Sequence, residues 1–322
     1  MNSADEIKKI ARRTIKLEGD SILSLESFID NEFAEIVQAI LQSSGRLIVT
    51  GVGKSANIAQ KMVSTFNSTG QPAIFMHAAD ALHGDLGNIQ PNDIVICLSK
   101  SGSTSEIKSL LPLLKEMGNP IIGITGTESS YLSQFSDWII LAKVEKEACP
   151  NNLAPTTSTT AQLVIGDALA VCLLECRQFT DVDFAKFHPG GALGKKLFLK
   201  IGDLCHSESI PKVKSSDSIK NVIVEISNKR LGATAVLDET NCLLGIITDG
   251  DIRRMLEKTV NWNALQASDI MSSSPITIDC DELASSALVI MESSQVSQIV
   301  VLKSSIYHGI VHLHDILKEG IN

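Results

Sequence analysis

The chain has 322 residues, with 28 Lys and Arg against 37 Asp and Glu, which gives a formal net charge of −9. This length suffices for two or more domains, each with its own core. The acidic balance, an aromatic content of 4% and the lack of a basic run argue against a nucleic-acid-binding surface. Any strongly positive surface must therefore be local, which singles out Lys54 and Lys100.

Residues 1–7 show no basic segment followed by an apolar run, so no secretory signal is predicted. The most apolar helical segment, 161–175, contains Asp167 and is expected to be too short to span a bilayer, so we predict a buried helix and no membrane association. Seven cysteines lie mostly in apolar runs without a CxxC pair. This pattern is typical of reduced core residues in a cytoplasmic protein.

In chain order, residues 5–43 place apolar side chains at helical spacing, which predicts helix. Short apolar runs follow at 47–52, 73–76, 94–98, 120–125 and 138–142, separated by helical segments. Strands that alternate with helices predict an α/β fold with a parallel sheet and right-handed crossovers. In such sheets ligands bind beyond the carboxyl ends of the strands.

The loop after the first predicted strand reads Gly51-Val52-Gly53-Lys54-Ser55. Its glycines let the backbone approach a ligand, but the GxxxxGK[ST] spacing of an ATPase is absent. Lys54 opens a helix, where the helix dipole disfavours a cation, so a neighbouring anionic ligand would explain its place.

The loop after the third predicted strand is the most informative feature of the chain. Residues 99–106 read SKSGSTSE and combine hydroxyls, a glycine and a lysine at a strand-to-helix turn. A helix N-terminus offers unpaired N–H groups and a dipole that favours an anion. A serine-rich helix cap is the alternative, but one cap needs only one hydroxyl. We therefore predict a phosphate site.

Three further polar segments carry ionisable residues. His77 and His83 lie within 77–87, but no third strong ligand is adjacent, which disfavours a structural zinc site. Glu147 precedes a polar loop that leads to a predicted helix start at 155–160. His188 stands before the glycine-rich turn 189–194.

After residue 200 two segments repeat at an offset of 64 residues: 233–237 matches 297–301, and 245–252 matches 309–316. Such self-similarity predicts one supersecondary unit used twice and packed around a shared core. We therefore predict domains at 1–198, 202–260 and 267–322.

Segments 51–55, 81–87, 99–106, 147–156 and 187–194 together resemble the arabinose-5-phosphate isomerases, which carry a sugar isomerase (SIS) domain and two cystathionine-β-synthase (CBS) repeats. The resemblance implies an SIS-type doubly wound, five-stranded parallel sheet flanked by helices, and then a tandem pair of βαββα-like CBS repeats. It also implies a homotetramer in which the His188 segment reaches a neighbouring subunit's site. Lys100 and Ser103 depart from the family pattern, which more often has a neutral residue and a glutamate there.

The resemblance also implies the site residues. The catalytic set is Lys54, His83, Glu106, Glu147 and His188. The phosphate would be held by Ser55, Ser99, Ser101, Ser103 and Thr104. No cofactor is required, and a zinc ion, inhibitory or structural if bound, would sit at His77.

The implied reaction interconverts D-ribulose 5-phosphate and D-arabinose 5-phosphate through an enediolate, for Kdo in lipopolysaccharide or capsule synthesis. It needs a base that carries a proton between C1 and C2 of the open-chain sugar, and a hydrogen-bond donor that stabilises the enediolate oxygens. The phosphate must also be anchored, so that the reacting carbons lie within reach of the base. Glu147 is the favoured base because it lies on a loop, free to reach the sugar, and partial burial would raise its pKa. Glu106 is either a base, a helix cap or a partner that orients Lys54.

Thr248 and Asp251 fit the GxxTxxD pattern of nucleotide-binding CBS repeats, whereas the second copy has His312 and Asp315. The CBS pair is predicted either to bind a nucleotide effector or to serve only as a scaffold that holds subunits together. Two alternatives to the isomerase remain: an SIS enzyme of another phosphosugar, and a non-catalytic phosphosugar sensor. The sensor would not need Glu147 or His188, so the enzyme is favoured.

Overall fold

The computed structural model describes residues 3–205, 210–258 and 261–321. The chain forms two compact units, Met1–Phe187 and His188–Asn322, which are described separately. This division falls at residue 187, whereas the sequence predicts the end of the first domain at 198. The predicted boundaries at residues 1, 260 and 322 lie outside the described residues.

The first unit is built on a five-stranded parallel sheet in the order β2-β1-β3-β4-β5. Its strands are β1 (Leu47–Gly51), β2 (Ala73–His77), β3 (Ile94–Ser99), β4 (Ile121–Thr125) and β5 (Trp138–Leu141). Each predicted strand is confirmed to within one residue at either end. The winding direction reverses between β1 and β3, so the loops after these two strands border the crevice in which such sheets bind ligands.

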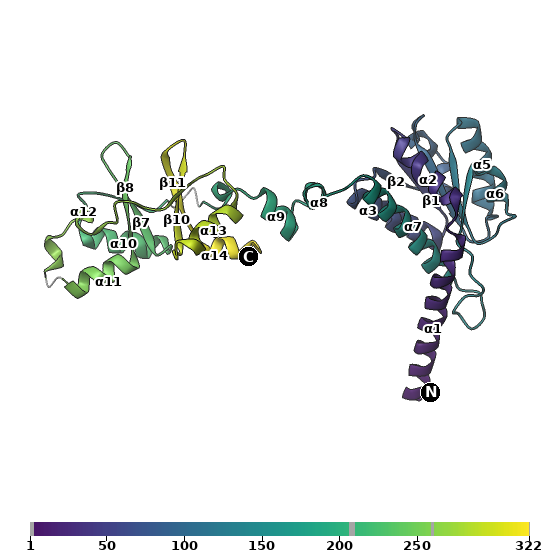
Figure 1. Ribbon diagram of the computed structural model, residues 1–322, viewed down its shortest axis with the longest axis horizontal. Coiled ribbons are helices and arrows are strands. Elements are labelled where there is room, and N and C mark those ends of the chain that lie inside the picture. The colour runs from purple at the N-terminus through teal and green to yellow at the C-terminus, as the bar shows by residue number, and fades with distance from the viewer. Residues whose placement is uncertain (1–2, 206–209, 259–260, 322) are drawn as a thin grey trace. The chain divides into compact units, whose positions relative to one another are not determined.

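Helices cover both faces of this sheet (Figure 1). On one face pack α2 (Asn31–Gln42), α3 (Lys54–Ser68) and α7 (Thr157–Cys176). On the other pack α4 (Ala78–Ala81), α5 (Ser105–Met117) and α6 (Tyr131–Phe135), and the 3-10 helix η2 (Asp85–Asn88) follows α4. Since both faces are buried, the strands read as continuous apolar runs in the sequence.

The predicted helical region 5–43 is broken into α1 (Ala4–Ser24), the 3-10 helix η1 (Leu25–Phe28) and α2. Asp30 causes the second start, because its carboxylate accepts the amides of Glu32 and Phe33. Figure 1 shows α1 projecting beyond the body of the first unit. None of its residues is buried, and the side chains of Ile7 and Ile15 are 58% and 73% exposed.

Helix α7 is longer than the sequence suggested. It has 20 residues and is, within the described parts of the chain, the one helix long and apolar enough to cross a membrane by length and composition. The expectation that this segment is too short was therefore wrong. Its buried residues, among them Ala161, Ile165 and Leu169, pack into the core of the first unit. The helix α8 (Asp181–Phe187) ends this unit.

The second unit begins with α9 (Ala192–Phe198) and η3 (Ile201–Leu204) and contains the two predicted repeats. The first consists of β6 (Lys212–Lys214), α10 (Ile219–Lys229), β7 (Ala233–Leu237), β8 (Leu243–Thr248) and α11 (Asp249–Lys258), and η4 (Trp262–Ala264) and α12 (Ala267–Ile270) follow it. The second consists of β9 (Thr277–Asp279), α13 (Ala284–Ser293), β10 (Gln298–Lys303), β11 (Ile306–His312) and α14 (Leu313–Lys318). Ala233, Ile246, Val300 and Ile310 form one cluster, so the two repeats share a core as predicted.

The turn after β3 depends on Gly102. Its φ is +62°, and a Cβ at this position would lie 2.1 Å from the Ser130 hydroxyl oxygen. Ser130 cannot easily move, because it is 3% exposed and its hydroxyl accepts the amide of Ser133 at the start of α6.

Gly102→Ala is therefore expected to lower the melting temperature of the first unit more than Gly118→Ala does. Gly118 has φ +78° but open space around its Cα, so its substitution carries only the left-handed backbone cost of about 1–2 kcal/mol. Differential scanning calorimetry of the full chain measures both. Equal shifts would show that the contact with Ser130 does not constrain the turn.

Candidate active site

The loops after β1 and β3 border a pocket of about 240 Å³ in the first unit. The starts of α3, α5 and α7 all reach it, through Lys54 and Ser55, Thr104, and Ser158 and Thr159 respectively. Its other lining residues are Val52, Leu98, Ser99, Lys100, Ser101 and Pro155. Because each helix start is the positive end of a helix dipole, the pocket favours an anion.

Three hydroxyl residues of the loop 99–104 line this pocket: Ser99, Ser101 and Thr104. The Ser99 hydroxyl accepts the Gly102 amide at 3.1 Å, and the Ser101 hydroxyl accepts the Ser103 amide at 3.3 Å. In these bonds the hydroxyls accept, so their own hydrogens can be donated to a ligand. Thr104 is the N-cap residue of α5, yet its side chain makes no capping hydrogen bond. The helix-cap alternative therefore leaves the Thr104 hydroxyl without a role, whereas a phosphate would use it.

Two predicted phosphate residues differ in their surroundings. Ser55 lines the pocket, and its hydroxyl donates to Gln162 Oε1 at 3.1 Å. Ser103 is absent from the lining residues, and its hydroxyl accepts the amide of Tyr131 at 3.4 Å. A role for Ser103 in phosphate binding stays a prediction.

Lys54 is the first residue of α3 and lies exposed at the mouth of the pocket. Its ammonium group forms no hydrogen bond or ion pair with any other residue that the structure describes. The side chain is thus available to a ligand anion.

Glu147 is not free to reach a sugar, and that expectation was wrong. The residue is 2% exposed, and its carboxylate contacts the lysine of the phosphate loop and the start of α7. Lys100 Nζ donates at 2.6 Å, the Ser158 hydroxyl at 2.5 Å and the Ser158 amide at 3.1 Å. The amide and hydroxyl of Thr156 donate at 2.8 and 3.2 Å.

These bonds also reverse the expected electrostatics of Glu147. Burial by itself raises the pKa of this carboxyl, but the hydrogen bonds from Lys100, Ser158 and Thr156 outweigh it and lower the pKa to about 2. In this arrangement the carboxylate is a charged anchor for the loop 147–158. Its catalytic role stays a prediction, and that role requires a change in its surroundings.

Glu106 lies in the first turn of α5. Its carboxylate accepts the Ser105 hydroxyl at 2.7 Å, and bonds from its own backbone amide and from Ser105 lower its pKa. Among the alternatives left open by the sequence, these contacts match a cap of the helix start. No bond joins Glu106 to Lys54 among the described side chains.

The two histidines of the segment 77–87 do not come together in a metal site. His77 ends β2, and its Nδ1 lies 4.0 Å from an Asp80 oxygen, whereas His83 is exposed. Over the described ranges, the only three ligating side chains whose donor atoms lie within 4.8 Å of one another are Asp279, Cys280 and Asp281 in the second unit. The residues around His77 thus provide no preformed three-ligand zinc site.

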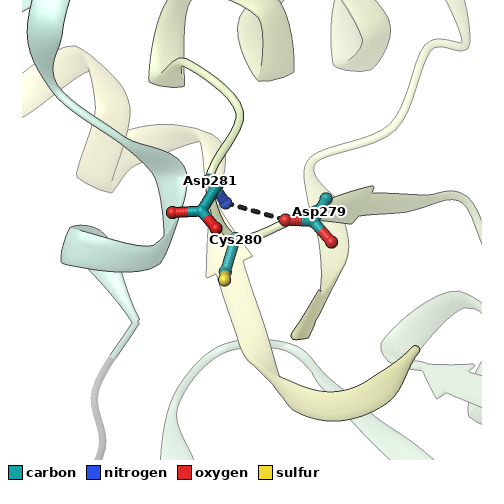
Figure 2. A group of neighbouring side chains, drawn as sticks. All are labelled: Asp279, Cys280 and Asp281. Carbon is teal, nitrogen blue, oxygen red and sulfur yellow. Dashed lines mark hydrogen bonds between the residues drawn. The ribbon is translucent and has the colours of Figure 1, made fainter. Parts of the chain in front are cut away.

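Figure 2 shows how these three side chains of the second unit are held. Asp279 accepts the backbone amide of Asp281 at 3.0 Å, and Asp281 accepts a hydrogen bond from Lys200 at 2.6 Å. Both carboxylates therefore have protein partners, which explains the cluster without an ion.

His188 is the first residue of the second unit, and its role at the site stays a prediction. The sequence reasoning also missed two members of the site. Ser158 and Thr159 line the pocket from α7, and Ser158 binds Glu147. The predicted helix start at 155–160 was the signal that could have located them.

The second unit has a cleft of about 540 Å³ beside the start of α11. Thr248, Asp251, Arg253 and Arg254 line it, together with residues of the segments 272–276 and 295–298. The Thr248 hydroxyl donates to Asp251 at 2.6 Å, and Arg254 donates to the same carboxylate at 2.5 Å. Asp315 in the second copy instead accepts the amide of His312 at 3.3 Å.

Comparison with known proteins agrees with this division. The model of the SIS domain matches residues 40–172, and that of the CBS domain matches 201–258 and 267–322. The Arabinose 5-phosphate isomerase KdsD of Pseudomonas aeruginosa is 44% identical over 313 residues, which are 97% of this chain and 96% of that protein. The KdsD of Escherichia coli K12 is 40% identical over 317 residues, 98% of this chain and 97% of that protein. The chain belongs to the KdsD arabinose 5-phosphate isomerase family.

Two solved structures are similar to part of this chain. That of E. coli CFT073 c3406 in complex with arabinose 5-phosphate is 39% identical with a TM-score of 0.57, and it covers 59% of this chain and 100% of its own. A putative sugar-phosphate isomerase from Listeria monocytogenes is 33% identical with the same TM-score of 0.57, and covers 59% and 100%. The predicted order of an SIS domain and two CBS repeats is confirmed by the residues that the two domain models match.

Glu147→Gln is expected to lower the free energy of unfolding at pH 7 by about 1–3 kcal/mol. The glutamine amide carries no charge to pair with Lys100, and its NH₂ group would face protein groups that themselves donate hydrogen bonds. The wild-type carboxyl has a folded pKa of about 2 against an unperturbed 4.5. Its stabilisation is therefore complete above pH 4.5 and is lost as the pH falls toward 2.

Urea unfolding between pH 7 and pH 3 measures this difference, with Glu145→Gln, an exposed residue of the same loop, as the control. The gap between wild type and Glu147→Gln should shrink toward the acid end. A gap that stays constant over this range would contradict the ionised anchor.

Proposed function

We propose that this chain interconverts D-ribulose 5-phosphate and D-arabinose 5-phosphate. The observation that carries the proposal is the pocket between β1 and β3. There, three helix starts and the ammonium groups of Lys54 and Lys100 surround a space suited to a phosphate, and a buried carboxylate lies directly behind it. The chain's membership in the KdsD family supports this choice of substrate.

In the proposed mechanism the phosphate anchors the open-chain sugar at Ser101 and Thr104, whose hydroxyl hydrogens are available to donate. Glu147 takes the proton from C2 of the aldose, the C1 carbonyl oxygen becomes an enediol hydroxyl, and the proton returns at C1 to give the ketose. Lys54 stabilises the negative charge that develops on the enediolate oxygens. Proton exchange between the sugar hydroxyls is assigned to the histidines of the set, His83 and His188.

Assay of the purified full chain tests the activity. Incubation with D-ribulose 5-phosphate, followed by NMR identification of the aldose formed, should give D-arabinose 5-phosphate. A different aldose would assign the chain to another phosphosugar. Binding of the sugar without turnover would favour the non-catalytic sensor.

The phosphate contacts predict the effect of Ser101→Ala. Loss of a hydrogen bond to a charged group costs about 1.5–3 kcal/mol, so KM should rise about tenfold or more with little change in kcat. Steady-state kinetics measure both constants. Ser109→Ala, an exposed serine on α5, is the matched control and should leave KM unchanged. An unchanged KM for Ser101→Ala would place the phosphate elsewhere.

We further propose a homotetramer in the cytoplasm, with His188 donated to a neighbouring subunit's pocket, and a role in Kdo supply. A mixed tetramer tests the His188 assignment. Subunits that carry His188→Ala and subunits that carry Glu147→Gln should regain activity when they are combined. If mixed tetramers form and activity does not return, the proposed exchange of residues between subunits is contradicted.

For the second unit we propose binding of a nucleotide effector in the cleft beside α11. The two arginines and the Thr248–Asp251 pair support this, since they offer charge to phosphates and acceptors to a ribose. At 100 times its Kd a ligand adds about 2.7 kcal/mol to the free energy of unfolding. AMP, ATP or a CMP-linked sugar should therefore raise the melting temperature of wild type.

Arg253→Ala should abolish that rise, whereas Lys258→Ala, at the far end of α11, should keep it. Thermal-shift assays measure both variants. No rise with any of the three ligands would favour the scaffold role of the CBS pair.

A further inference from the structure

Lys100 lies in the phosphate loop but points its charge at the proposed base. It directly follows β3, and its Nζ lies 2.6 Å from Glu147 Oε1. The side chain of Lys100 is 45% exposed, whereas that of Glu147 is fully buried. The lysine thus occupies the border between the pocket and the carboxylate.

The two ends of this ion pair differ in their freedom to move. Glu147 is held by the amides and hydroxyls of Thr156 and Ser158 at the start of α7. The backbone of Lys100 is also fixed, because its carbonyl accepts the amide of Gly126 at 3.0 Å. Only the flexible lysine stem, with a compact ammonium group at its end, can change partner without moving the loop.

A phosphate in the pocket would offer Lys100 such a partner. Lys100 lines the pocket beside Ser99 and Ser101, and a phosphate dianion carries twice the charge of a carboxylate. We propose that Lys100 is a positioning residue that holds and shields Glu147 in the free protein and swings to the phosphate when substrate binds. The inference rests on the proposed function, in which Glu147 is the base.

The exchange has two consequences for Glu147. First, its carboxylate becomes accessible from the pocket. Second, a buried carboxylate that loses its cation binds a proton more tightly, which makes it a stronger base. Lys100 forms the ion pair with this carboxylate, the Cys149 thiol is a further titratable group near it, and Lys54 lines the same pocket as Lys100. Binding of the phosphate, a part of the substrate that does not react, would thus activate the base that acts on C1 and C2.

Kinetics of Lys100→Met against pH test the proposal, with Lys108→Met, an exposed lysine of α5, as the control. The fall of kcat/KM on the acid side of its pH profile (its acid limb) reports the pKa of the base in the free protein. The acid limb of kcat reports the pKa of the base in the complex with substrate. Lys100→Met should move the acid limb of kcat/KM upward by at least about one pH unit, leave that of kcat in place, and raise KM about tenfold. The ionisation of the substrate phosphate affects wild type and variants alike, so it cancels in the comparison.

Acid limbs that move together, or not at all, would overturn the exchange. If Lys100→Met lowers stability but shifts the acid limb of neither pH profile, Lys100 has only a structural role, and the proposed exchange is also overturned. Lys100→Gln serves as a second neutral variant if Lys100→Met does not fold. Turnover by wild type without the expected shift rejects this inference alone, whereas absence of turnover by wild type rejects the proposed function as well.

Discussion

The convergence of three helix starts on one pocket is the constraint on which the site depends. Where the winding of the sheet reverses between β1 and β3, α3 and α5 leave opposite faces and begin beside each other, and α7 brings a third start. The first N–H groups of each helix have no partner within their own helix, and the dipole of each helix favours negative charge there. At the start of α7 the protein supplies this charge itself, with the Glu147 carboxylate. At the starts of α3 and α5 an anionic ligand in the pocket would supply it.

This arrangement ties the chemistry to the core of the first unit. Helix α7 packs its buried face against α3 and the sheet, so the amides that hold Glu147 belong to a rigid element. Asp167 in α7 also forms an ion pair with Lys61 of α3. Rigid placement of polar groups by the scaffold is the condition for precise recognition of a substrate. Lys54 and Lys100 are the exposed lysines among the residues that line the site.

The sheet and the phosphate loop could be predicted because their signals are local. Continuous apolar runs mark strands buried on both faces, and hydroxyls around Gly102 mark a turn at a helix start. Burial of Glu147 could not be predicted in this way, because its partner Lys100 is 47 residues away and a lone glutamate suggests exposure. The orientation of Ser103 toward α6 was equally hidden, since the serines of the loop are alike in sequence.

The most direct test of the account is a crystal structure of the full chain with D-arabinose 5-phosphate. The account predicts the phosphate among Ser101, Thr104 and the starts of α3 and α7, with the Lys100 ammonium group on a phosphate oxygen and C2 of the sugar facing Glu147. A sugar bound in the second unit, or a phosphate in this pocket with Lys100 still on the Glu147 carboxylate and C2 turned away from it, would contradict the account.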